Sequence, residues 1–98
     1  MNTQITAAIQ FIPLTDPKTA YREIDEIISI IQSMELNYTV CPFETVIEGT
    51  LENILKVITA INEKSKTLSC EQFILNVKFH INKNQNLSLE TNIKKYSK

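Results

Sequence analysis

The sequence predicts an α+β domain of βαββαβ order, in which two helices cover one face of a four-stranded antiparallel sheet. Three observations predict it. Segments 4–13 and 71–81 alternate apolar residues, as strands do, and segments 17–34 and 51–66 repeat them every three or four positions, as amphipathic helices do. Between these segments a β-prone stretch is split by Pro42, which is typical of a hairpin.

A change in the spacing of apolar residues, from every second position to every third or fourth, predicts the first strand and the first helix. In residues 4–13 the apolar side chains occupy alternate positions: Ile5, Ala7, Ile9 and Phe11. Asp16 then offers an N-cap side chain, and Pro17 stands at the first helical position, where no N–H is needed. From Pro17 to about Met34 an apolar stripe recurs that needs a sheet to cover it.

The middle of the chain predicts a hairpin and a second helix. Residues 36–40 and 45–48 are β-prone, and Pro42 lies between them. Thr50 follows the single glycine of the chain and can cap a helix that continues to about Lys66.

The final strand is expected at 71–81, with Phe73, Leu75, Val77, Phe79 and Ile81 facing the core. Ser88 can then cap a short C-terminal helix. The complete order is that of a ferredoxin-like sandwich. We expect one domain over residues 1–98, with its core in 3–81 and a tail in 82–98.

Composition excludes several classes of function. The net charge of -1 provides no positive field for nucleic acid, and no apolar run approaches the roughly 20 residues that span a bilayer. With no basic segment ahead of an apolar run at the N-terminus, we expect a cytoplasmic protein. Cys41 and Cys70 are expected to be reduced thiols, and we expect no metal site and no cofactor.

Catalysis is also not expected. His80 is the single histidine and has no acid or nucleophile near it in sequence, and Cys41 has no candidate base. Because the ferredoxin-like fold carries many functions, the fold alone does not decide among them.

Three short runs carry a resemblance to a known family. They are residues 8–14 (AIQFIPL), 42–49 (PFETVIEG) and 76–79 (NVKF), of which TVIEG directly before a helix is the most specific. Together these runs resemble the thiamine-binding protein family over most of residues 3–81. The resemblance implies a homo-oligomer, dimer or tetramer, that binds thiamine or its hydroxymethylpyrimidine moiety.

The residue chemistry fits such a ligand. An aminopyrimidine places ring-nitrogen acceptors beside an amino donor, which a carboxylate, an amide and a hydroxyl on rigid strands can recognise. A cationic thiazolium is favoured by a carboxylate or an aromatic face. The candidate ligand-binding residues are therefore Gln10, Tyr38, Phe43, Thr45, Glu48 and Asn76, with Glu48 as the principal one.

Purely structural roles, without a ligand, also remain open for three of these residues. Glu48 can be a strand-end charge, Gln10 can pair with a polar side chain of a neighbouring strand, and Asn76 can lie on a solvated sheet face. The face opposite the helices carries Ala8, Ile12, Val46 and Ile74 and is more apolar than a solvated face should be, which favours self-association. The alternative function is a regulatory or assembly module without a small-molecule ligand; an enzyme is a third possibility.

Overall fold

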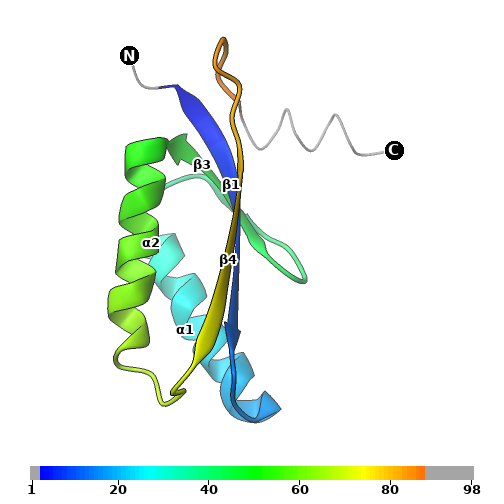
Figure 1. The fold of residues 1–98 in the computed structure, drawn as a ribbon, viewed down its shortest axis with the longest axis vertical. Helices are drawn as coiled ribbons and strands as arrows, with labels where there is room; N and C mark the ends of the chain where they lie inside the picture. Colours follow the sequence, from blue (N-terminus) through cyan, green and yellow to red (C-terminus); the bar gives the residue numbers. More distant parts are fainter. Residues whose placement is uncertain (1–2, 88–98) are drawn as a thin grey trace.

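A computed structural model describes residues 3–87 and has the predicted ferredoxin-like architecture (Figure 1). Its elements are β1 (Gln4–Pro13), α1 (Pro17–Ser33), β2 (Tyr38–Val40), β3 (Thr45–Thr50), α2 (Leu51–Ser65) and β4 (Phe73–His80). The strands lie in the order β2-β3-β1-β4 with every pair antiparallel, and both helices lie on one face. The C-terminal helix predicted after Ser88 lies outside the described residues.

Both helices begin at the predicted caps. The Asp16 carboxylate accepts the backbone N–H of Thr19 at 2.9 Å, and the Thr50 hydroxyl accepts the N–H of Asn53 at 3.1 Å. Each bond satisfies one of the N–H groups that a first helical turn leaves without a partner. Glu35, at φ 61°, takes the left-handed conformation just after α1 and turns the chain toward β2.

The core lies between the sheet and the two helices. The alternate residues of β1 face inward as predicted, and they meet Ile47 of β3 and the buried stripes of α1 and α2. The buried apolar cluster comprises Ile5, Ala7, Ile9, Phe11, Ile27, Ile31, Ile47, Ile54, Val57 and Ile61. Burial of each large side chain contributes roughly 1.5–3 kcal/mol, so this cluster holds the two layers together.

The last strand differs from its prediction at its end. It stops at His80, and both Phe79 and Ile81, expected in the core, are exposed, by 40 % and 51 %. The reason is position: the helices pack over β1 and β3, whereas β4 lies at the edge of the sheet. The alternation of apolar residues therefore predicted which face of β4 points to the core, but not how much of that face the helices cover.

The two neighbours of β1 do not pair with it over the same length. β3 pairs with β1 only from Gln4 to Ile9, whereas β4 continues to Pro13. Four residues of β1, 10–13, thus extend beyond the last β3 partner, Thr45. The β2–β3 hairpin bends to one side of this extension and α1 lies on the other (Figure 1).

Candidate ligand-binding site

A groove of about 350 Å³ lies along this unpaired extension of β1. Its walls come from α1 on one side and from the hairpin on the other. The lining is mostly apolar and includes Phe11, Ile12, Tyr21, Ile24, Ile28, Cys41, Pro42 and Phe43, with Gln10, Glu44 and Thr45 as polar members. An apolar hollow with a few polar groups is the usual form of a small-molecule site.

The backbone of Phe11 faces this groove. The N–H of Leu14 donates to the carbonyl of Gln72 at 2.9 Å, which marks a hydrogen-bonded pair of the β1–β4 ladder. Because such pairs recur every second residue, the even residues of β1 bond to β4 and the odd ones face β3. Phe11 is odd and lies beyond the last β3 partner, so its N–H and C=O point to the groove side. Pro13, which has no N–H to pair, occupies the next such position.

A tight turn forms the hairpin wall. The N–H of Cys41 donates to the carbonyl of Glu44 at 2.8 Å and closes the turn. This turn leaves the Phe43 ring 82 % exposed at the mouth of the groove. Such an exposed aromatic ring beside a hollow can stack on a planar ligand.

A second, shallower hollow of about 300 Å³ lies on the sheet face opposite the helices. There the Asn76 amide donates to the Gln10 side-chain carbonyl at 3.0 Å, and Lys78 lies 3.5 Å from the Glu44 carboxylate. Gln10 and Glu44 line both hollows and therefore connect them.

The structure brings some of the candidate residues together. Gln10, Phe43 and Thr45 line the groove, although Thr45 is only 4 % exposed, and Asn76 joins Gln10 on the open face. The pairing of Gln10 with a neighbouring polar strand residue, one of its two interpretations, is present. Tyr38 lies on the edge strand β2 and lines neither hollow.

Glu48 lies elsewhere on the open face. It is opposite Thr6 in the sheet, four residues before Gln10 along β1 and thus about 13 Å from it. Its carboxylate accepts a hydrogen bond from the Asn37 amide, and its N–H donates to the Asn37 carbonyl at 3.0 Å. Glu48 lines neither the groove nor the shallower hollow.

Other groove groups were missed from the sequence. The sequence predicts the apolar residues of α1 only as core, and it does not mark Glu44 as a ligand-binding residue although Glu44 lies within the quoted hairpin run. The unpaired edge at Phe11 has a signal in the sequence, because the predicted strand at 4–13 is longer than the predicted strand at 45–48.

Reactive side chains are not gathered at either hollow. His80 is exposed at the end of β4, and Cys41 and Cys70 are separate free thiols. Within residues 3–87 no three His, Cys, Asp or Glu side chains group in a way that could hold a metal ion. No helix of this described part is long and apolar enough to cross a membrane.

Comparison with known proteins decides the family. A family model described as thiamine-binding protein matches residues 7–97. The chain belongs to the thiamine-binding protein family. A UPF0045 protein of Clostridium perfringens is 26% identical over 65 residues, a match that covers 66% of this chain and 64% of that relative's length.

Several solved structures of other proteins are similar in fold to this member of the thiamine-binding protein family. A proposed thiamine biosynthesis/salvage protein of Thermotoga maritima matches with a TM-score of 0.87 at 22% identity, over 95% of this chain and 98% of that chain. A domain of unknown function from Bacillus cereus matches with a TM-score of 0.87 at 25% identity, over 98% and 92%. Because the Thermotoga maritima protein is only 22% identical to this chain, its similarity shows the fold alone.

Proposed function

We propose that this thiamine-binding family protein binds thiamine, or the hydroxymethylpyrimidine moiety of thiamine, in the groove beside Phe11, without chemical turnover. We further propose that it acts in the cytoplasm as a homo-oligomer. The observation that carries the proposal is the unpaired backbone edge of β1 at Phe11, which adjoins the exposed ring of Phe43.

Backbone geometry supports an aminopyrimidine ligand. A strand residue that directs its N–H and C=O to the same side presents a donor beside an acceptor. An aminopyrimidine edge presents the complementary pair, a ring nitrogen beside an amino group. The Phe11 N–H donates to the ring nitrogen and the Phe11 C=O accepts from the amino group, each bond contributing about 0.5–1.5 kcal/mol.

Side chains of the groove complete the site. The Phe43 ring stacks on the pyrimidine, and the Gln10 and Glu44 side chains meet the polar substituents at the end of the groove that opens to the sheet face. For thiamine itself, the thiazolium cation is favoured by the face of Phe43 and by the Glu44 carboxylate. A volume of about 350 Å³ lies within the usual range for ligands of this size.

Titration calorimetry with thiamine and with hydroxymethylpyrimidine tests the proposal. Phe43→Ala removes a stacking surface worth about 0.5–1.5 kcal/mol, so the dissociation constant should rise about twofold to tenfold. Tyr38→Ala is the matched control, because it removes an exposed aromatic ring that does not line the groove. Equal losses in both variants, or no binding by the parent chain, would contradict the proposal.

A second candidate function is an assembly module without a ligand. The half-buried Ala8, Ile12 and Val46 and the exposed Ile74 favour it, because they leave the open face apolar enough to drive association. An oligomer that shows no heat of binding and no shift in melting temperature with either compound would select this alternative.

A further inference from the structure

Two exposed aromatic side chains line the same groove from opposite walls. Among the described residues, Phe43 and Tyr21 are the two most exposed large apolar side chains, at 82 % and 73 %, and both line the groove beside β1. Phe43 belongs to the hairpin turn, whereas Tyr21 lies in the second turn of α1. A large ring left in water gives up the free energy that burial would contribute, so two such rings at one groove indicate a ligand that covers them.

The position of Tyr21 follows from the apolar stripe of α1. Tyr21, Ile24 and Ile28 lie on this stripe at steps of three and four, and both isoleucines are half-buried in the wall of the groove. Because β3 pairs with β1 only as far as Ile9, no β3 residue pairs beside residues 10–13. The first half of the stripe therefore borders the groove, with the ring of Tyr21 at its rim.

The charge of the groove suits a cation. Glu44 supplies a carboxylate, and none of the described residues that line the groove is a Lys, Arg or His. Lys78 pairs with this carboxylate at 3.5 Å, but it lines the shallower hollow on the open face and its side chain is 75 % exposed. An exposed ion pair contributes little, so a ligand cation can take the place of Lys78. The aromatic faces of Tyr21 and Phe43 attract positive charge as well.

The groove is long enough for two rings. Residues 10–13 of β1 extend over about 13 Å at about 3.3 Å per residue. The groove along them has a volume of about 350 Å³. Thiamine carries its pyrimidine and its thiazolium on one bridging carbon, so the two rings lie next to each other and need two neighbouring surfaces.

We propose that Tyr21 is a specificity-determining residue that stacks on the thiazolium of thiamine, an inference that rests on the function proposed for the groove. Phe43 covers the pyrimidine from the hairpin, and Tyr21 covers the cationic ring from α1. Free hydroxymethylpyrimidine has no second ring and makes no contact with Tyr21. The site therefore binds intact thiamine more tightly than the free pyrimidine.

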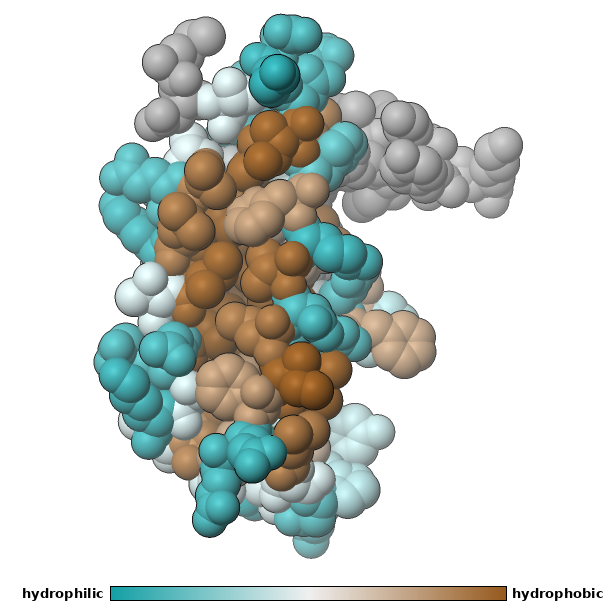
Figure 2. All heavy atoms as spheres, in the orientation of Figure 1, coloured by the Kyte–Doolittle hydropathy of each residue, from teal (hydrophilic) through white to brown (hydrophobic). Residues whose placement is uncertain are grey.

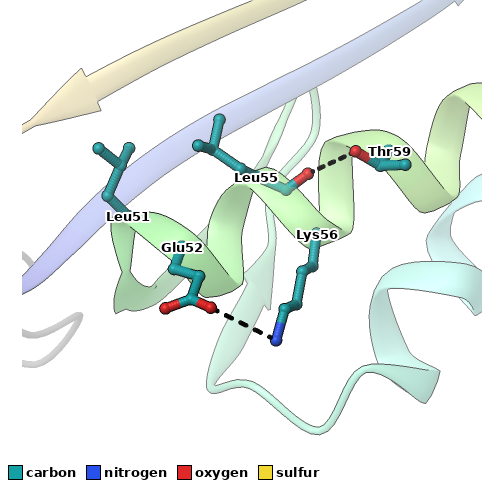
Figure 3. A pocket seen from close by; sticks show the side chains of 5 residues that line it. All are labelled: Leu51, Glu52, Leu55, Lys56 and Thr59. Atoms are coloured by element: carbon teal, nitrogen blue, oxygen red, sulfur yellow. Dashed lines mark hydrogen bonds and ion pairs between the residues drawn. The ribbon is translucent and has the colours of Figure 1, made fainter.

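A larger hollow beside α2 lacks these features. Figure 2 shows apolar side chains gathered in one band over α2 and β4. The hollow beside α2, of about 600 Å³, is lined by residues of that helix alone: Leu51, Glu52, Leu55, Lys56 and Thr59 (Figure 3). Glu52 pairs with Lys56 at 3.9 Å, and the Thr59 hydroxyl donates to a carbonyl of its own helix at 3.0 Å. This lining offers no aromatic ring, and its polar groups already have partners within the helix.

Titration calorimetry with two ligands and matched variants tests the role of Tyr21. The parent should bind thiamine more tightly than hydroxymethylpyrimidine. Tyr21→Ala should raise the dissociation constant of thiamine about twofold to tenfold and should change that of hydroxymethylpyrimidine by less than about twofold. Tyr21→Phe keeps the ring and should bind both compounds as the parent does. Phe43→Ala should weaken both, and Tyr38→Ala, which removes an exposed ring outside the groove, should weaken neither.

Tyrosine fluorescence gives an independent readout. The chain has no Trp, so its emission comes from Tyr21, Tyr38 and Tyr96. Thiamine stacked on Tyr21 should quench part of this emission in the parent and in Tyr38→Phe, but not in Tyr21→Phe. Equal quenching in Tyr21→Phe and in the parent would mean that the thiazolium does not lie on this ring.

Failure of this inference differs from failure of the function proposed for the groove. If the parent binds neither compound, that function is wrong and the role of Tyr21 falls with it. If the parent binds thiamine and Phe43→Ala weakens the binding, but Tyr21→Ala affects both compounds equally or neither, only the assignment of Tyr21 is overturned. Circular dichroism spectra that match the parent show that each variant is folded.

Discussion

Glu23 of α1 accepts the backbone N–H of Ser69 at 2.7 Å, across 46 residues of chain, and so fixes the segment between α2 and β4. The same carboxylate oxygen accepts the Ser69 hydroxyl at 3.2 Å and the N–H of Cys70 at 3.3 Å. Glu23 is 2 % exposed. Burial, followed by the charge of Glu23 and a hydrogen bond to it, raises the pKa of the Cys70 thiol above its usual 9.0.

Glu23→Ala should lower the free energy of unfolding by about 1.5–3 kcal/mol, because it leaves the backbone N–H groups of Ser69 and Cys70 without their carboxylate acceptor. Urea unfolding followed by circular dichroism measures the loss. Glu23→Gln is the control: it keeps one acceptor oxygen, so its loss should be smaller. If the two variants are equally stable, the carboxylate does not hold this segment.

Asp16→Ala should lower the melting temperature at pH 7 and have little effect in strong acid. The hydrogen bond from the Thr19 N–H holds the pKa of Asp16 below its usual 3.8. A carboxylate with a lowered folded-state pKa contributes stability that is present above about pH 3.8 and is lost as the pH falls through the folded-state pKa. Melting curves between pH 2 and pH 7 test this, and Asp16→Asn, which caps without titrating, should keep most of the stabilisation.

Glu48→Gln distinguishes the two possible ligand positions. If the ligand lies in the groove beside Phe11, this substitution should change the dissociation constant for thiamine less than threefold, because Glu48 lies about 13 Å from Gln10 along the sheet. Loss of a charge-assisted bond to the ligand would instead cost about 1.5–3 kcal/mol, or roughly tenfold to a hundredfold in affinity. A loss of that size would place recognition on the open face, with Glu48 as its principal residue.

Val46→Lys should break any association through the open face. Val46 is half-buried on β3, so the added charge lies among the apolar neighbours of that face. Light scattering should show the mass of the parent oligomer falling by at least a factor of two. An unchanged mass would mean that the open face is not used for assembly.

The caps and the periodic segments could be predicted because their causes are local. Asp16 and Thr50 lie within three residues of the N–H groups that they accept, and the stripe of α1 depends only on spacing along one helix. The ligand site was less accessible to such reasoning. Glu48 and Gln10 face the same side of the sheet, yet strand register separates them, and register is set by pairing between distant segments.

The sequence by itself determined the element order, the two helix starts, the inward faces of β1, β3 and β4 and, through residues 7–97, the family. Only the tertiary structure decided that β1 extends beyond β3, which opens the groove at Phe11, and that β4 is the last strand of the sheet in the described part of the chain. The physical reason is that alternation and helical period report which side of an element is apolar. How far a neighbouring element covers that side depends on strand lengths and packing across the whole domain.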